Sequence, residues 1–331
     1  MKNESEYISL RSEVRTVSNV TPLVGASLIS ESKAMREVLR MVGRVVTSDV
    51  PILITGESGV GKDLIAELIH TMSLRGHCPL VKVDCSTLPV ESVEAELFGE
   101  VTSVRGRTQR ERPGLLFQAQ SGTIVLDRLS ELPVTIQSKL ARVLEKKKIF
   151  LLQSNSPTTI NCRLVATIQR HAEELIRDGK LREDLYYEIS AISLLVPPLR
   201  DRREDILPLA NSFLKRFAAQ TNRVISGYTP AAAEMLRKFD WPGNVRQLQN
   251  EVQRTVLMCE GEQVDVQDLS ISAPRVETPE DETNLPLMEA MKRNAIIQML
   301  KQTGGNKLET AKRLGIGRQT LYNKIKAYGI E

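Results

Sequence analysis

The sequence of 331 residues is poor in cysteine and in aromatic residues, and it contains no long apolar run. Its four cysteines show neither CxxC spacing nor nearby metal-ligand clusters; they are Cys78, Cys85, Cys162 and Cys259. We therefore expect free thiols in a reducing cytosol, and neither a disulfide framework nor a zinc site. No segment approaches the roughly 18 apolar residues of a membrane span, and the first residues, MKNESEYISL, lack the apolar stretch of a signal peptide. These absences predict a cytoplasmic protein.

Charge of either sign is also not in large excess. Lys and Arg number 45 against 41 Asp and Glu, a net charge of +4, which excludes a uniformly basic nucleic-acid coat protein. The hydrophobic share of 41% and the charged share of 26% are typical of a globular chain. The length predicts two or three domains.

Short apolar segments alternate with helical patterns in the first two thirds of the sequence. Five segments rich in Val, Ile and Leu lie at 51–55, 80–84, 123–127, 162–168 and 192–196. Their lengths and spacing predict an α/β domain with a mostly parallel sheet covered on both faces. From 203 to 269 no strand pattern occurs, and helical runs at 204–220, 230–239 and 244–259 predict an all-helical second domain.

A glycine-rich motif follows the first of these segments. Residues 56–63, GESGVGKD, fit GxxxxGK between a strand and the start of a helix. The glycines would let backbone amides surround a phosphate, and the lysine would reach the β- and γ-phosphates. A glycine-rich turn that binds nothing is the alternative, but this context favours nucleotide binding. The candidate binding residues are Gly56, Glu57, Ser58, Gly59, Val60, Gly61, Lys62 and Asp63, the last in place of the usual Ser or Thr.

A second nucleotide element ends at Asp127, the acid that closes the apolar segment 123–127. An acid in this place holds Mg²⁺ with the nucleotide, so Asp127 is the predicted metal ligand. Hydrolysis also needs a group that orients water, most often a neighbouring carboxylate. The next residue is Arg128, whose side chain cannot accept a proton because its pKa lies above about 12.

Four further blocks resemble the bacterial enhancer-binding proteins, the AAA+ activators of sigma-54 RNA polymerase. They are ELFG at 96–99, LREDLYY at 181–187, PPLRDRREDI at 197–206 and WPGNVR at 241–246. The resemblance runs from about residue 24 to the C-terminus. It implies an AAA+ core that binds ATP and forms a dimer, a hexamer or a mixed ring with a related activator. It also implies that Arg182 reaches into a neighbouring subunit's nucleotide, and that Arg246 senses the phosphate within its own subunit.

With this resemblance the sequence divides into five parts. Residues 1–20 are a short N-terminal arm, 21–198 the α/β nucleotide-binding subdomain and 199–270 the helical lid. Residues 271–284 are a linker rich in acids and proline, and 285–331 are a helix-turn-helix domain.

The nucleotide site departs from the family pattern in several places. The catalytic Asp-Glu pair is Asp127-Arg128, and the asparagine that restrains the glutamate is Asp84. The remaining departures are Ile168-Gln169 at the Thr-Asn sensor pair and Glu188 at a second trans-acting arginine. With these replacements no catalytic residue set is intact. Loss of a general base typically costs about 10²–10⁴ in rate, so impaired hydrolysis is predicted.

Two of these changes are chemically complementary. We hypothesise that Asp84 and Arg128 form an ion pair that locks the site in a non-hydrolysing form and favours ATP as a structural ligand. The alternative is two independent surface substitutions.

The loop that contacts sigma-54 in the family, Gly-Ala-Phe-Thr-Gly-Ala, aligns with SVRGRT at 103–108. Its length is kept but its residues differ, so we expect the sigma-54 contact to be lost. Basic residues gather there beside Glu111, namely Arg105, Arg107, Arg110 and Arg112. They fit a solvated face, a nucleic-acid contact or an anionic signal such as cyclic di-GMP, which some family members bind.

Residues 285–331 carry nine basic and three acidic residues, net +6, which leaves −2 for the rest of the chain. A helix at 308–314, a glycine turn and a basic helix at 318–328 describe a helix-turn-helix, and GRQTLYNK at 317–324 resembles the Fis-type domain. Leu321 and Ile325 should pack inward, and 287–300 would form the dimer helix on a palindromic DNA site. The predicted DNA-binding residues are Arg318, Gln319 and Asn323 for base edges, Thr320, Lys324 and Lys326 for phosphates, with Tyr322 beside them. A basic bundle that binds only protein is the alternative.

The favoured interpretation is a transcription regulator on a degenerate AAA+ core that binds ATP and hydrolyses it poorly, acting with housekeeping RNA polymerase or in mixed rings. One alternative is a functional ATPase that activates sigma-54 RNA polymerase, alone or in mixed oligomers with an intact relative. Another is a DNA binder that needs no nucleotide.

Overall fold

The computed structural model describes residues 21–23, 26–104, 108–150, 157–271, 296, 299–300, 303, 306–314 and 316–327. The chain divides into two compact units, residues 1–274 and 275–331, each of which is described by itself. Within the described residues, no helix combines the length and the apolar character needed to cross a membrane.

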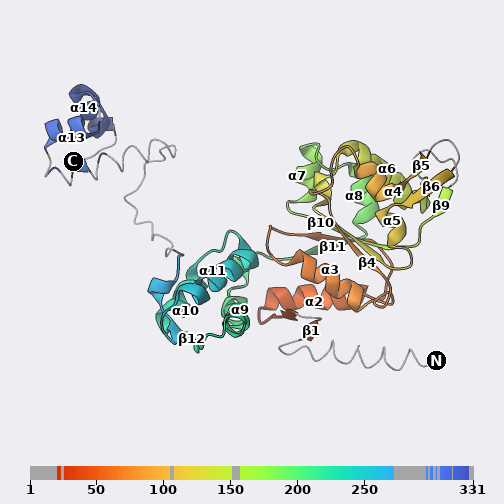
Figure 1. Ribbon diagram of the computed structural model, residues 1–331, viewed down its shortest axis with the longest axis horizontal. Coiled ribbons are helices and arrows are strands. Elements are labelled where there is room, and N and C mark those ends of the chain that lie inside the picture. The colour runs from red at the N-terminus through yellow and green to blue at the C-terminus, as the bar shows by residue number, and fades with distance from the viewer. Residues whose placement is uncertain are drawn as a thin grey trace. The chain divides into compact units, whose positions relative to one another are not determined.

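A sheet of five parallel strands forms the centre of the first unit (Figure 1). The strands are β3 (Ile52–Thr55), β4 (Leu80–Asp84), β7 (Thr123–Asp127), β10 (Arg163–Ile168) and β11 (Ile192–Leu195). Their order is β11-β3-β10-β7-β4, and every neighbouring pair is parallel. They coincide with the five predicted segments except for single residues at some ends. Because the strands are parallel, their carboxyl ends meet at one edge of the sheet.

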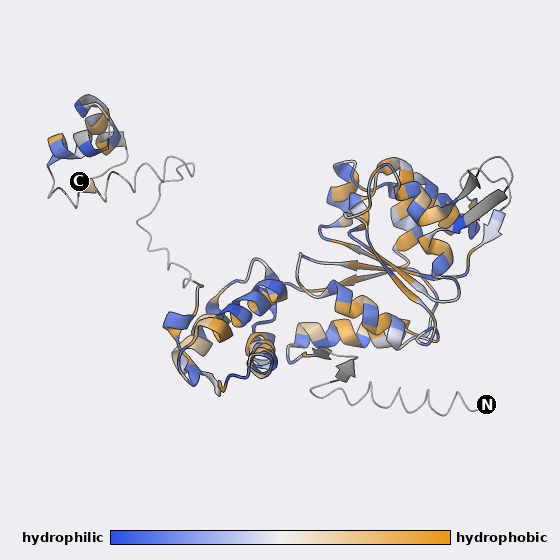
Figure 2. Ribbon diagram, in the orientation of Figure 1, coloured by the Kyte–Doolittle hydropathy of each residue, from blue (hydrophilic) through white to orange (hydrophobic). Residues whose placement is uncertain are grey.

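Helices cover both faces of this sheet, as the strand pattern predicts. Alternate residues of β3 face opposite sides, since Ile52 and Ile54 belong to one buried cluster and Leu53 to the other. The apolar residues along the strands and the inner helix faces form these two layers (Figure 2). One layer holds α2 (Lys33–Val45) and α3 (Lys62–Thr71); the other holds α4 (Val93–Phe98), α5 (Leu115–Gln118), α6 (Val134–Lys146), α7 (Ala172–Arg177) and α8 (Glu183–Ile189).

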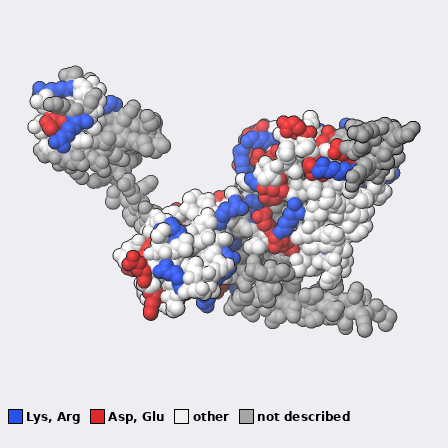
Figure 3. Space-filling model, in the orientation of Figure 1, with Lys and Arg blue, Asp and Glu red and all other residues white. Residues whose placement is uncertain are grey.

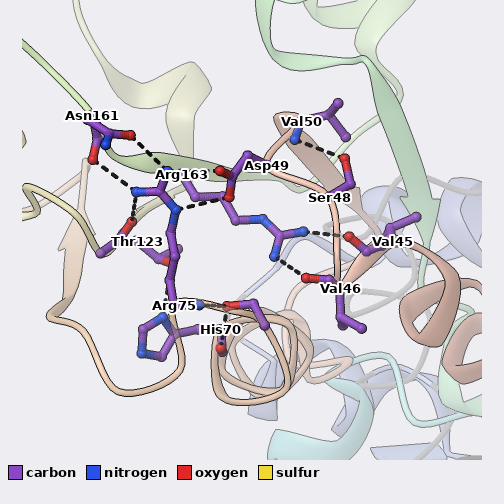
Figure 4. A network of polar contacts seen from close by, with 12 residues as sticks. Val45, Val46, Ser48, Asp49, Val50, His70, Arg75, Thr123, Asn161 and Arg163 are labelled. Atoms are coloured by element: carbon purple, nitrogen blue, oxygen red, sulfur yellow. Dashed lines mark hydrogen bonds and ion pairs between the residues drawn. The ribbon is translucent and has the colours of Figure 1, made fainter. Parts of the chain in front are cut away.

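A polar network ties α2 to the amino ends of the strands (Figure 4). The buried Arg163 begins β10 and donates to the carbonyls of Val45 and Val46 at the end of α2. Arg75 follows α3 and forms an ion pair with Asp49 at 2.9 Å. The network therefore lies at the opposite edge from the phosphate loop, and its role is to anchor the layer formed by α2 and α3.

Three antiparallel hairpins complete the α/β part. They are β1 (Thr21–Leu23) with β2 (Ala26–Leu28), β5 (Gly99–Val104) with β6 (Thr108–Pro113), and β8 (Lys148–Phe150) with β9 (Pro157–Thr159). None of them is predicted from the sequence. The reason is visible in β6, whose residues TQRERP show no alternation of apolar and polar side chains.

The helical part that follows contains α9 (Ile206–Gln220), α10 (Pro230–Lys238) and α11 (Asn244–Met258), with short 3₁₀ turns η2 (Leu199–Asp201), η3 (Arg203–Asp205) and η4 (Val266–Asp268). Its core surrounds Trp241, which is fully buried and donates its indole N–H to the Leu236 carbonyl at 2.9 Å. The prediction that this region lacks strands is wrong, because β12 (Gly227–Tyr228) pairs in parallel with β13 (Gln263–Val264). Two-residue strands are too short to produce an alternating pattern.

The second unit contains α13 (Lys307–Arg313) and α14 (Arg318–Ala327), packed around Ile296, Ala311 and Leu321. Leu321 is fully buried and Ile325 packs against this cluster, so the predicted inward positions are confirmed. The predicted arm at 1–20, nearly all of the linker and most of the predicted dimer helix at 287–300 lie outside the described residues.

Candidate nucleotide site and DNA interface

The predicted phosphate loop connects β3 to α3 at the carboxyl edge of the sheet. Gly56, Gly59 and Gly61 adopt φ values of +150°, +77° and +103°, which L side chains rarely adopt. At Gly59 a Cβ atom would also lie 2.5 Å from the carbonyl oxygen of Gly243 and 3.0 Å from Cβ of Arg246. The glycines are therefore needed both for the curl of the loop and for its close approach to the start of α11.

Lys62 lies in the mouth of this loop. Its Nζ donates to the carbonyl oxygens of Gly56 at 2.8 Å and Glu57 at 2.9 Å, and the residue is only 7% exposed. Burial lowers the pKa of Lys62, while the nearby carboxylates of Asp127 and Asp63 oppose this shift. Desolvation and then the neighbouring Asp127 raise the pKa of Asp63 in the first turn of α3. A buried ammonium that donates hydrogen bonds to two neutral carbonyls is suited to receive an anionic phosphate.

Residues of the helical part hold the loop from its other side. Arg200 donates to both carboxylate oxygens of Glu57, at 2.9 and 2.5 Å. Asn244 donates its side-chain amide to Glu57 at 3.1 Å and to the Ser58 carbonyl at 3.0 Å. We call Glu57, Arg200 and Asn244 the loop–lid latch. Its two donors lower the pKa of Glu57, the Arg200 hydrogen bonds first and that of Asn244 second.

Two carboxylates end neighbouring strands beside this loop. Asp84 closes β4 and Asp127 closes β7, and the two residues are direct partners in the strand register. Thr167 of β10 donates its hydroxyl to Oδ1 of Asp127, and the Cys85 amide donates to the Asp127 carbonyl at 3.0 Å. The sheet therefore sets both acids side by side at the edge where the phosphates would lie.

Arg128 follows Asp127 in the left-handed region, with φ +55°. Its backbone N–H donates to the Thr167 hydroxyl at 3.1 Å, and its guanidinium Nη2 forms an ion pair with Oδ2 of Asp84. Its Nε lies 3.6 Å from Oδ2 of Asp127. The predicted Asp84–Arg128 ion pair is thus confirmed.

The pKa of Asp84 lies below its ordinary value. Partial burial acts to raise this pKa, but hydrogen bonds from the hydroxyl and amide of Ser86, both 3.0 Å long, and the Arg128 guanidinium outweigh it. Asp84 is therefore held as a carboxylate.

The remaining predicted site residues are more dispersed. Ile168 is fully buried at the end of β10, and Gln169 after it is exposed. Arg246 lies on the first turn of α11, where its backbone N–H donates to the Gly59 carbonyl at 3.3 Å. Arg182, the predicted trans-acting finger, pairs with Asp184 of its own chain at 2.7 Å.

Four residues at this site are absent from the sequence-based set: Ser86, Thr167, Arg200 and Asn244. Arg200 and Asn244 do lie in two of the blocks that resemble the family, so their place in a motif was the available signal. Ser86 and Thr167 lie in none of these blocks. Ser86 contacts Asp84 only two residues away, whereas the contacts of Thr167 depend on the order of the strands.

Strands β5 and β6 flank the arginine-rich segment in the sequence, and their pairing places Val104 opposite Thr108. Arg105 and Arg107 lie outside the described residues. Arg112 is already engaged, since its guanidinium lies 2.9 Å from Glu96 and 3.8 Å from Glu100.

In the second unit, α14 carries the predicted base-reading residues on the helix that follows the turn. Arg318, Thr320 and Tyr322 are exposed, whereas Lys324 is half-buried. The Arg318 guanidinium lies 5.7 Å and the Lys307 ammonium 5.3 Å from the centre of the Tyr322 ring. The side chains of Gln319, Asn323 and Lys326 lie outside what the structure describes. On the face shown in Figure 3, the charged residues on the described surface of this unit are more often Lys and Arg than Asp and Glu, while the first unit shows both signs.

The comparisons with known proteins assign families to all three regions. Residues 28–195 match the sigma-54 interaction domain, 200–284 the AAA+ ATPase lid domain and 288–328 the bacterial regulatory protein, Fis family. The chain is 36% identical to the transcriptional regulatory protein ZraR of Klebsiella oxytoca over 92% of this chain and 70% of ZraR. It is 35% identical to the regulatory protein AtoC of Escherichia coli over 98% of this chain and 72% of AtoC.

The fold agrees with solved structures of a related protein. NtrX from Brucella abortus in complex with ATP is 31% identical to this chain, with a TM-score of 0.72 over 98% of this chain and 73% of NtrX. Its complex with ADP gives a TM-score of 0.70. The α/β fold with a P-loop, a helical lid and a helix-turn-helix is thereby confirmed. The chain belongs to the sigma-54-dependent transcriptional regulators, the bacterial enhancer-binding proteins.

Proposed function

We propose that this chain is a DNA-binding regulator of transcription whose AAA+ core binds ATP and hydrolyses it slowly. The observation that carries the proposal is the position of Arg128. It follows Asp127 where the family has its catalytic glutamate, and it is held there by its ion pair with Asp84.

ATP is the proposed ligand of the loop. Lys62 and the curled glycines provide the donors that phosphates need, and the latch brings the lid onto the same loop. Arg246 stands at the start of α11 beside Gly59, in place for a phosphate sensor. The Brucella NtrX structures with ATP and ADP support the same ligand for this chain.

Slow hydrolysis follows from the chemistry of the replaced residue. A guanidinium cannot take a proton from water, and Asp84 is engaged by Arg128 and Ser86. Two further replacements are expected to slow hydrolysis more. Gln169 stands in place of the sensor asparagine, and Glu188 in place of a trans-acting arginine. The predicted role of Asp127 as a ligand of Mg²⁺ stays a prediction, because the same carboxylate faces Arg128.

For the output, we propose that the altered loop at 103–108 does not engage sigma-54 in the usual way. The regulator would then act with housekeeping RNA polymerase or in a mixed ring with an intact relative. Binding of cyclic di-GMP at the arginines of this hairpin stays a prediction, and Arg112 is already paired with Glu96. DNA binding as a dimer on a palindromic site is proposed for the second unit.

The test is ATP turnover by the purified full chain with Mg²⁺ present. We expect the double variant Asp84→Asn/Arg128→Glu to release phosphate at least about tenfold faster than the native chain, since a general base is worth about 10²–10⁴ and other family residues are still missing. Lys62→Ala should abolish ATP binding in both backgrounds. Phosphate release by the native chain comparable to that of an intact relative such as AtoC would contradict slow hydrolysis.

Transcription in vitro then separates the outputs. With sigma-54 RNA polymerase we expect no activation by the native chain, and an effect on promoters of the housekeeping polymerase. Activation of sigma-54 transcription by the native chain alone would favour the working ATPase.

A further inference from the structure

We propose that the core binds its nucleoside triphosphate without a divalent cation, with the Arg128 guanidinium in the cation's place. This inference rests on the proposed binding of ATP. It concerns what neutralises the phosphates at the ends of β4 and β7, and it goes beyond the loss of the water-activating group.

Both carboxylate oxygens of Asp127, the predicted metal ligand, already have polar neighbours. Oδ1 of Asp127 accepts the hydroxyl of Thr167, and its Oδ2 faces Nε of Arg128 at 3.6 Å. Mg²⁺ requires near-octahedral oxygen ligands at about 2.0–2.1 Å and gives up its waters reluctantly. Mg²⁺ at Asp127 would have to share this carboxylate with the Arg128 guanidinium, and the two positive charges would repel each other.

Charge at these strand ends also matters. Asp84, Asp127 and Arg128 together carry one negative charge, because the guanidinium offsets one of the two carboxylates, and Asp63 of α3 is a further carboxylate near Asp127. Two carboxylates without a guanidinium attract a divalent cation, but the guanidinium between them repels it.

The Arg128 guanidinium is also held in place. The Arg128 backbone is fixed in the left-handed region by its N–H bond to Thr167, which itself donates to Asp127. The side chain is one-third exposed, so it borders the open edge of the sheet and is not sealed in the core. A planar guanidinium is also well suited to phosphate oxygens, which it binds through two parallel N–H groups.

The test is a titration of the full native chain with a fluorescent ATP analogue, once with MgCl₂ and once with EDTA. We expect the two dissociation constants to agree within about threefold, since no metal ligand would be lost. A metal-free affinity weaker by about tenfold or more would overturn the inference and leave ATP binding intact. Absence of binding in both buffers would overturn ATP binding itself, and the inference with it.

Variants assign the effect to Arg128. Arg128→Gln should weaken metal-free binding by about tenfold, because a charge-assisted contact to phosphate is lost. Asp84→Asn/Arg128→Glu should bind more tightly with MgCl₂ than with EDTA. Arg170→Gln is the matched control. Arg170 is an exposed arginine two residues after the end of β10, and it pairs with Glu174 and Asp178. Equal loss in Arg128→Gln and Arg170→Gln would contradict a direct role for Arg128, and circular dichroism of each variant checks its fold.

Discussion

The Tyr322 ring lies near two cations of the second unit, Lys307 and Arg318, and this contact bears on the predicted role of Arg318 in DNA binding. A guanidinium over an aromatic ring is attracted to the ring face, which restricts its rotamers before DNA is bound. Arg318 is the first residue of α14, and in a helix-turn-helix the first residues of the second helix face base edges. We infer that the ring positions Arg318 for a guanine.

Arg318→Ala should weaken binding to the specific site by about 1–3 kcal/mol, the value of one bidentate base contact. Tyr322→Leu should lose part of the same binding free energy. Tyr322→Phe keeps the ring, so its binding free energy should stay near the native value. The measurement is fluorescence anisotropy on a duplex selected from a random library and on random DNA. Arg313→Ala is the control, because Arg313 pairs with Glu309 in the same unit. An equal loss on random DNA would make Arg318 a phosphate contact only.

At the scale of elements, the latch couples the helical lid to the phosphate loop. Glu57 has a lowered pKa because of its donors Arg200 and Asn244, so its charge stabilises the latched form. A lowered folded pKa means that this stabilisation is present above the ordinary glutamate value of 4.5 and disappears as the pH falls through the folded value. The pair is about 40% exposed on each side chain, so solvent screens it.

Glu57→Gln should therefore lower the free energy of unfolding by no more than about 1 kcal/mol at pH 7, the upper end for an exposed pair. The difference from the native chain should vanish at acidic pH. Urea unfolding followed by Trp241 fluorescence measures this, because Trp241 is the single tryptophan and is buried in the lid core. Glu234→Gln, at an exposed lid glutamate, is the control. A difference that does not change with pH would show that Glu57 acts through packing and not through its charge.

Some of these elements could be predicted from the sequence, and others could not. The five parallel strands were predictable because strands buried on both faces are continuous runs of Val, Ile and Leu, such as Ile52, Leu53 and Ile54. The hairpins were not, because their strands are polar or only three residues long. The latch was not either, since Glu57 and Arg200 lie 143 positions apart and meet only after the sheet has formed.

The nucleotide site was predictable to a similar extent. The order of its motifs and the chemical complementarity of Asp84 and Arg128 were enough to predict their ion pair. The approach of the Arg128 guanidinium to Asp127, and the bridging hydroxyl of Thr167, follow from the placement of β7 between β4 and β10. Sequence order alone does not reveal that placement.

At the scale of the whole molecule, positive charge and the helix-turn-helix coincide in one unit. Residues 285–331 carry net +6, and the remainder carries −2. The two units have separate cores, since Ile271 packs in the lid core and Ile296 in that of the second unit. We therefore expect nucleotide binding and DNA binding to be separable.

A chain that ends at residue 284 should bind the fluorescent ATP analogue with unchanged affinity and lose measurable binding to both specific and random DNA. The loss on random DNA follows because phosphate attraction depends on Lys and Arg, and the remaining protein is slightly acidic. Fluorescence anisotropy at low and at physiological salt measures this loss of DNA binding. DNA binding that survives the deletion would point to the arginines near the β5–β6 hairpin. Substitution of Arg110 would then decide between a nucleic-acid contact and a solvated face.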